Sequence, residues 1–170
     1  MTDLERLLAG REERVSLQAH VLRVSEVIAQ VSLNIPGLPK RMAGDREVVF
    51  RVMGMIRRKL QPLGGGPVLQ FSLDNGAGYA GILGVDCVDP VAVKRIAMEI
   101  EDLPWGSVLD VDVVIRTGAL HRAGLTGIER KCFLCGRPAK DCARFQRHDY
   151  LLLRAACERL LASALEALRE

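Results

Sequence analysis

The chain has 170 residues, of which 49% are hydrophobic and 26% charged, a composition that excludes a disordered or low-complexity protein. Its formal charge of +3 is too small to indicate a general nucleic-acid binder. No stretch approaches the roughly 18 apolar residues of a membrane helix, and the first residues do not form a signal peptide. We therefore expect a cytoplasmic protein whose five cysteines are reduced.

The spacing of apolar residues and turn signals predicts alternating helices and strands with no linker and no repeat. Asp45 is expected to cap the second helix, and Asp89 followed by Pro90 to begin the third. The order fits one mixed α+β domain over residues 1–170, with a sheet, flanking helices and a C-terminal helix. The expected elements are a helix at 11–24, a strand at 27–33, a helix at 45–63, hairpin strands at 68–73 and 79–85, a helix at 90–102, a strand at 107–116, an irregular segment and a helix at 149–169.

Two carboxylates stand on the strand expected at 107–116. Asp110 and Asp112 are two residues apart, so they point to the same side of that strand, with Cα atoms roughly 6.5 Å apart. Such a pair repels unless a cation lies between the carboxylates or one of them is protonated, and Mg²⁺ is the usual cation beside phosphate oxygens. The pair is equally compatible with a solvent-facing strand surface. Asp is disfavoured in strands, and the upstream Gly106-Ser107 resembles the Gly-Ser element of nucleotidyltransferases, so we predict a nucleotidyltransferase-like sheet.

Positive charge is concentrated between Arg116 and Arg147, where eight Lys/Arg against two acids give +6 and leave −3 for the other 138 residues. We call residues 116–148 the basic segment. Arginine forks suit phosphate oxygens. Carboxylates for a metal beside cations for phosphate are typical of phosphoryl or nucleotidyl transfer.

The basic segment also contains Cys132-x2-Cys135-x6-Cys142-x5-His148, four groups that suit a tetrahedral zinc ion. The spacing leaves open a second interpretation, in which these side chains are packing or active-site groups among phosphate-binding arginines. The remaining cysteines, Cys87 and Cys157, are expected in the core.

Several motifs together resemble one family. They are Gly106-x3-Asp110-Val111-Asp112-Val113, Arg122, and Arg130-x-Cys132-x2-Cys135-x6-Cys142-Ala143-Arg144-x3-His148, with Arg11-x2-Arg14-x3-Gln18, Pro36-Gly37-x2-Lys40, and Lys94 with Glu99 further upstream. The chain resembles the holo-citrate-lyase synthases, also called apo-citrate lyase phosphoribosyl-dephospho-CoA transferases. Ser107 and Leu109 depart from the family pattern, which usually has an arginine and an aromatic residue there.

The resemblance implies an enzyme that transfers phosphoribosyl-dephospho-CoA from 2′-(5″-triphosphoribosyl)-3′-dephospho-CoA to a serine of the acyl-carrier subunit of apo-citrate lyase, with release of pyrophosphate. On this hypothesis Asp110 and Asp112 are the catalytic pair and hold Mg²⁺ at the donor triphosphate. The expected phosphate contacts are Arg11, Arg14, Lys40, Arg122, Arg130 and Arg144.

The alternative is a non-enzymatic module in which a zinc knuckle presents basic loops to RNA or to an acidic protein partner. Phe133 and Phe145 are the aromatic residues at or near the cationic stretch. Base-stacking surfaces need more aromatic side chains than this, so we expect an enzyme that binds neither nucleic acid nor a membrane.

Overall fold

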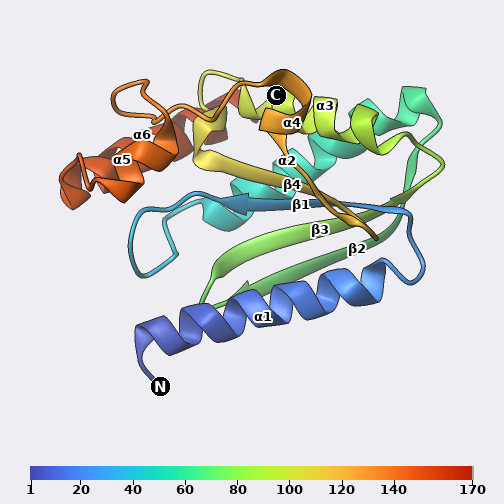
Figure 1. The fold of residues 1–170 in the computed structure, drawn as a ribbon, viewed down its shortest axis with the longest axis horizontal. Coiled ribbons are helices and arrows are strands. Elements are labelled where there is room, and N and C mark those ends of the chain that lie inside the picture. The colour runs from blue at the N-terminus through green and yellow to red at the C-terminus, as the bar shows by residue number, and fades with distance from the viewer. Residues whose placement is uncertain (170) are drawn as a thin grey trace.

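The computed structural model describes residues 1–169, the side chains of residues 67 and 68 excepted. It has the mixed α+β fold that the sequence predicts: one antiparallel sheet between helices (Figure 1). The strands are β1 (Val27–Leu33), β2 (Gly66–Asn75), β3 (Gly78–Asp86), β4 (Leu109–Ile115) and β5 (Gly118–Leu120), in the spatial order β2-β3-β1-β4-β5. The helices are α1 (Asp3–Val21), α2 (Asp45–Leu60), α3 (Pro90–Glu101), α4 (Arg122–Thr126), α5 (Ala139–Arg144) and α6 (Tyr150–Ala167), with short 3₁₀ turns at Gln61–Leu63 and Gly106–Val108.

The sheet separates two layers of unequal size. Helix α1 runs along one face, while α2 and α3 lie against the other (Figure 1). The larger core lies on the α2 and α3 side and includes residues of α6, among them Cys157 and Leu161. The smaller one, beneath α1, is formed by Val21, Ile28 and Ile82. Because α1 contributes little apolar surface, the sheet face beneath it retains polar side chains, which is where a site can form.

Most predicted elements are confirmed, with differences at their ends. Helix α1 begins at Asp3 rather than near residue 11, because Thr2 and Glu5 form a capping box at its start. The cap predicted for α2 is wrong by one residue. Gly44 is the N-cap, with a φ of 80°, and Asp45 is a buried first-turn residue that accepts a hydrogen bond from its neighbour's backbone N–H. Asp89 caps α3 as predicted.

The segment expected to be irregular contains β5, α4 and α5, which are three to six residues long and too short for a clear periodic pattern. The two cysteines outside the basic segment differ in burial. Cys157 is fully buried, as predicted, whereas the core placement of Cys87 is wrong: it is exposed in the turn after β3, with a φ of 59°. Among residues 1–169, we find no helix with the length and apolarity to cross a bilayer.

Candidate active site

The two aspartates of β4 face the α1 side of the sheet. In the register with β1, Asp110 lies opposite Ser32 and Asp112 opposite Gln30. The alternate residues of β4, such as Val111, are buried in the larger core on the other side. The prediction that the two carboxylates share one face is therefore confirmed.

A cleft of about 390 Å³ lies between α1 and this face of the sheet. Helix α1 supplies cations and an amide, the strands supply the carboxylates with an amide and a hydroxyl, and the loop after β1 supplies a lysine. The polar lining residues are Arg11, Arg14, Gln18, Gln30, Ser32, Asn34, Lys40, Asp110 and Asp112. Segments far apart in the sequence thus place both predicted carboxylates and three of the predicted phosphate contacts around one space.

Asp112 is the member of the carboxylate pair whose ionised form is disfavoured by its surroundings. Burial raises the pKa of Asp112 above its ordinary value, and the negative charge of Asp110 raises it further. Lys94 and Arg130 oppose this shift without cancelling it. Ionised Asp112 is therefore a group that a bound cation would stabilise.

Arg14 extends from α1 into the cleft, and its guanidinium group is anchored by hydrogen bonds. Its guanidinium donates to the carbonyl oxygens of Ala77 at 2.7 Å and Gly78 at 3.1 Å, in the β2–β3 turn. Burial lowers the pKa of Arg14, while Asp110 raises it and Arg11 lowers it again. Its Nε is buried without a hydrogen-bond partner within the described part of the chain. The guanidinium is thus held in place by the two carbonyl contacts at the edge of the cleft.

Lys40 enters the cleft from the loop between β1 and α2. Its Nζ donates to the carbonyl oxygen of Ile35 at 2.6 Å. Burial lowers the pKa of Lys40, and the nearby charges of Arg11 and Arg154 lower it further. Arg154 of α6 also donates to the carbonyl oxygen of Pro36 at 3.0 Å, which fixes this loop against the C-terminal helix. An anion in the cleft would relieve the repulsion among these cations.

The outer edge of β4 is completed by two side chains of α3 in place of a strand. Glu101 accepts the backbone N–H of Val111 at 2.9 Å, and Lys94 donates to the carbonyl oxygen of Val111 at 3.0 Å. Both side chains are buried. They hold the backbone between the two aspartates straight where β5 no longer pairs with it. Glu99, which the resemblance associates with Lys94, instead pairs with Lys59 at the surface.

Arg122 and Arg130 come from the basic segment and converge on Glu101. Arg122 also pairs with Asp102 at 2.8 Å, and Arg130 with Asp110 at 3.2 Å. Burial alone would lower the pKa of Arg122, but its hydrogen bonds to Asp102 and Glu101 raise it. Both arginines border a second cavity of about 600 Å³ on the other side of the aspartates. They lie at the site, but acidic side chains of the protein already occupy their donors.

Arg144 is the one predicted phosphate contact that the fold leaves away from the aspartates. It lies at the end of α5, exposed, with its guanidinium 5.6 Å from the centre of the Phe145 ring. Arg147 lies near the same ring at 5.1 Å. The lining residues of the aspartate cleft do not include Arg144.

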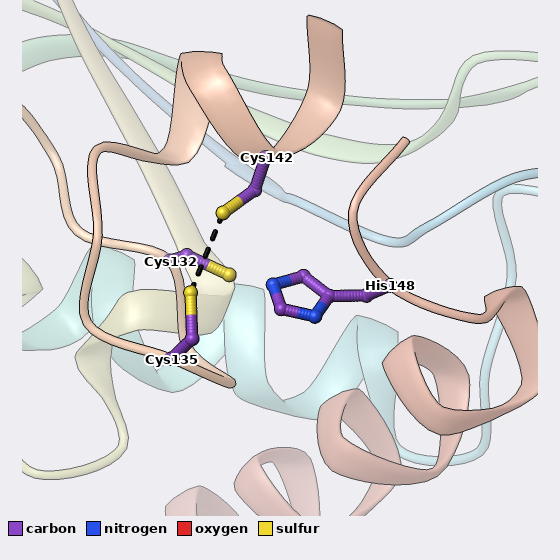
Figure 2. A group of neighbouring side chains, drawn as sticks. All are labelled: Cys132, Cys135, Cys142 and His148. Atoms are coloured by element: carbon purple, nitrogen blue, oxygen red, sulfur yellow. Dashed lines mark hydrogen bonds between the residues drawn. The ribbon is translucent and has the colours of Figure 1, made fainter. Parts of the chain in front are cut away.

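The cysteines of the basic segment and His148 meet at one point (Figure 2). One ligand atom from each of Cys132, Cys135, Cys142 and His148 lies within 4.8 Å of the others, and the Sγ atoms of Cys135 and Cys142 are 3.4 Å apart. A backbone hydrogen bond at Arg137 lowers the pKa of the Cys135 thiol to about 7, and burial raises that of Cys142 to about 12. The four groups bring together the ligand types that zinc prefers.

Sequence reasoning assigned no role at the site to four polar residues beside the aspartates: Gln18, Gln30, Ser32 and Glu101. Gln18 donates to Gln30 at 2.9 Å, and Gln30 in turn approaches Asp112 at 3.5 Å. Gln18 had been noted only as part of the N-terminal motif. Gln30 and Ser32 alternate with core residues along β1, and that alternation of polar residues in a β-branched strand was the available signal. Glu101 had no comparable signal, although it lies seven residues after Lys94 and so on the same side of α3.

A carboxylate pair beside basic side chains in one cleft of a mixed α+β scaffold is typical of a transferase for phosphorus-containing groups. A model of the family CitX, apo-citrate lyase phosphoribosyl-dephospho-CoA transferase, matches residues 2–164, and the chain belongs to this family. A relative from Streptococcus pyogenes serotype M3 is 31% identical over 166 residues, which cover 94% of this chain and 85% of the relative. Another from Vibrio cholerae serotype O1 is 31% identical over 160 residues, covering 92% and 90%. Both are named "Probable apo-citrate lyase phosphoribosyl-dephospho-CoA transferase". The family does not favour the alternative of a non-enzymatic binding module.

Proposed function

We propose that this protein transfers the phosphoribosyl-dephospho-CoA group from 2′-(5″-triphosphoribosyl)-3′-dephospho-CoA to a serine of the acyl-carrier subunit of apo-citrate lyase. The observation that carries this proposal beyond family membership is the cleft itself. Asp110 and Asp112 face Arg11, Arg14 and Lys40 across it, so the protein offers both ligands for a cation and partners for phosphate in one place.

Asp110 and Asp112 suit a magnesium ion. Asp112 shows that the pair fits a cation. Its pKa is raised by burial and by the adjacent carboxylate, so the protein alone does not fully neutralise its negative charge. The donors are carboxylate oxygens, with the Gln30 amide and the Ser32 hydroxyl in the same cleft, and oxygen donors are what Mg²⁺ prefers. When bound, Mg²⁺ would stabilise the negative charge that develops on phosphate oxygens during transfer.

Arg11, Arg14 and Lys40 would hold the triphosphate. Arg14 is anchored by its hydrogen bonds to the carbonyl oxygens of Ala77 and Gly78, which fix the position and orientation of its guanidinium. Lys40 and Arg11 bring two more positive charges to the same space. Charge-assisted hydrogen bonds from several cations suit a polyphosphate better than a single phosphate.

The apolar part of the donor would extend into a neighbouring cavity of about 560 Å³. Asn34 lines both this cavity and the aspartate cleft, so the two adjoin. Phe133, Tyr150 and Leu153 give the second cavity apolar and aromatic walls. Such walls suit the adenine ring and the pantetheine chain of dephospho-CoA.

In the transfer step, the carrier serine oxygen forms a bond to the α-phosphorus of the donor. The bond from that phosphorus to the bridging oxygen breaks, pyrophosphate leaves with the electron pair, and the serine proton passes to solvent water. The chain's own contribution is to orient the triphosphate with Arg14 and Lys40 and to hold β4 in place through Glu101. Positioning and electrostatic stabilisation account for most of the catalysis in reactions of this kind.

The proposal is tested by intact-mass measurement of an apo carrier subunit incubated with the donor, Mg²⁺ and this protein. We expect the carrier to gain the mass of the prosthetic group with one pyrophosphate released per group attached. The variant Asp112→Asn should abolish the gain while retaining the fold. A carrier that gains mass at the wild-type rate with this variant would overturn the assignment of the site.

The phosphate contacts are tested separately with Arg14→Gln. We expect this variant to raise the KM for the donor more than it raises the KM for the carrier, because the side chain faces the triphosphate side of the cleft. Arg23→Gln is the matched control, since Arg23 is an exposed arginine just beyond the C-terminal end of α1. Equal donor KM values for the two variants would contradict the role of Arg14.

A further inference from the structure

We propose that Cys132, Cys135, Cys142 and His148 bind one structural zinc ion. Their ligand atoms lie within 4.8 Å of one another although the residues come from three different local structures. Cys132 and Cys135 flank a tight turn, Cys142 lies on α5, and His148 precedes the Asp149 cap of α6. Figure 2 shows the three thiols and the imidazole directed toward a common centre.

The distances fit a tetrahedral zinc site. With zinc–sulfur bonds of about 2.3 Å, two thiolates on a tetrahedron lie about 3.8 Å apart. The Sγ atoms of Cys135 and Cys142 are 3.4 Å apart, close to this value and well beyond the roughly 2.05 Å of a disulfide. The cluster therefore has the spacing of groups gathered around an ion.

His148 provides an independent indication of a ligand. Its Nε2 is buried and has no hydrogen-bond partner within residues 1–169. A buried ring nitrogen without a partner is costly, yet the imidazole points at the three sulfur atoms (Figure 2). Coordination to a metal would satisfy this atom without moving the side chain.

The backbone around the first two cysteines has the form of a zinc knuckle. The N–H of Cys132 donates to the carbonyl oxygen of Arg137 at 2.7 Å, and the N–H of Gly136 donates to the carbonyl oxygen of Cys132 at 3.0 Å. Gly136 has a φ of 70°, a conformation that favours glycine and lets the chain turn back after Cys135. The turn presents both thiols on one side, as a C-x-x-C half-site requires.

The site is structural because its four ligands close the tetrahedron and leave no position for a substrate. The surrounding chain needs such support. Helices α4 and α5 have five and six residues, too few for stability on their own, and most residues from 134 to 149 are exposed. A metal would replace the apolar core that this part of the chain lacks.

The same ion would connect the basic segment to the aspartate cleft. Arg130 lies two residues before Cys132 and pairs with Asp110 and Glu101. At the other end, His148 is followed directly by the cap of α6. Zinc would hold both ends of residues 132–148, the second half of the basic segment, and so act on Arg130 as a positioning element. Three thiolates and Zn²⁺ together carry one negative charge, so the segment remains cationic.

The first test measures the zinc content of the full-length protein, purified under reducing conditions, by mass spectrometry of the metal. We expect about one zinc ion per chain. Cys135→Ser should lower zinc affinity by more than the roughly 10- to 100-fold that loss of an outer-shell partner costs. Cys87→Ser is the matched control, because Cys87 is also exposed but lies outside the cluster, and it should retain the wild-type zinc content. Equal zinc contents for the two variants, or a disulfide between Cys135 and Cys142 in the purified wild-type protein, would overturn the proposal.

The second test follows the segment without using activity. Trypsin has cleavage sites at Lys140, Arg144 and Arg147, all on exposed residues. We expect removal of zinc by a chelator to speed cleavage at these sites, and addition of zinc alone to restore protection in the wild type but not in Cys135→Ser. Cleavage rates that are unchanged by the chelator would rule out a structural ion here. This result is independent of the transferase proposal, because neither donor nor carrier is present.

Discussion

Replacing Asp112 by asparagine should abolish transfer and at the same time stabilise the fold. The two carboxylates of β4 project from the same side of one strand, with Cα atoms about 6.5 Å apart. Two unit charges at that separation repel by about 2.5 kcal/mol at an effective dielectric constant of about 20. Arg130 neutralises part of the charge on Asp110, and Lys94 part of that on Asp112.

We therefore expect Asp112→Asn to raise the free energy of unfolding by about 1–2 kcal/mol in magnesium-free buffer at neutral pH. For a chain of this length that corresponds to a rise in Tm of about 2–8 °C. The assay is thermal unfolding followed by circular dichroism, without a chelator so that any zinc stays in place. Asp3→Asn is the control, because the Asp3 side chain is 70% exposed and its loss should change the Tm little.

The gain in stability from Asp112→Asn should depend on pH. Because the pKa of Asp112 is raised in the folded state, the wild type keeps that proton to a higher pH when folded than when unfolded. The unfolding free energy of the wild type is therefore not reduced by Asp112 below the ordinary aspartate pKa of 3.8. It falls as the pH rises through the pKa that Asp112 has in the folded protein. The advantage of Asp112→Asn should be largest at neutral pH and vanish toward pH 4. A variant that is less stable than wild type at pH 7, or an advantage that grows on acidification, would refute the account of repulsion at this site.

Three further predictions concern Glu101, magnesium and the cysteines outside the basic segment. Glu101→Gln should destabilise the protein by about 1.5–3 kcal/mol, because a neutral amide replaces the buried carboxylate that accepts from two partly exposed arginines. Glu99→Gln, which loses only a surface pair, should change stability by less than about 1 kcal/mol in denaturant titration. Adding Mg²⁺ should raise the Tm of the wild type, by an amount equivalent to about 2.7 kcal/mol at 100 times the Kd, and an absence of any rise would contradict a site at the aspartates. Iodoacetamide should modify Cys87 before Cys157, since Cys157 is fully buried and burial raises its pKa to about 11; peptide mapping with the opposite order would contradict the fold of α6.

Local sequence patterns predicted those features of the fold that depend on neighbouring residues alone. The alternation along β4 predicted a shared face for Asp110 and Asp112, and Asp89 followed by Pro90 predicted the start of α3. The strand order β2-β3-β1-β4-β5 was beyond such reasoning, because pairing of distant strands depends on tertiary packing and not on local periodicity. Cys87 shows the same limit, since a cysteine after an apolar strand gives no sign of whether the chain turns outward there.

The candidate site was predicted through residue types whose spacing is itself informative. Cys132, Cys135 and His148 gather as the spacing suggested, because a C-x-x-C turn restricts where its thiols can point. Glu101 and Gln30 were missed because their importance arises only from the strand edge and register that they meet. Side chains that replace a missing strand have no sequence signature, since the same residues on another helix face would be ordinary surface groups.

The distribution of charge takes on a different meaning once the fold is known. The basic segment carries +6, and from the sequence it was expected to face the donor triphosphate. In the structure its two arginines nearest the aspartates, Arg122 and Arg130, are paired with acids of α3 and β4. The cations that line the aspartate cleft come instead from the remaining part of the chain, which is acidic overall: Arg11 and Arg14 of α1, and Lys40 of the loop after β1.

The two groups of cations have different roles: one fixes the strand that carries the aspartates, and the other is available to bind phosphate. Arginines held by Glu101 fix the strand that carries the aspartates, and they remain charged whether or not a substrate is present. The cations of α1 and its neighbouring loop have fewer acidic neighbours, and burial with mutual repulsion lowers the pKa of Lys40. An arriving polyphosphate would relieve that repulsion, so binding energy would be gained where the donor sits and not spent on breaking ion pairs. Substituting Arg130 should therefore lower stability and kcat together, whereas substituting Arg11 should raise the donor KM with the Tm unchanged. Steady-state kinetics combined with thermal unfolding of the two variants would show this separation, and a stable Arg130 variant with a defect confined to donor KM would contradict it.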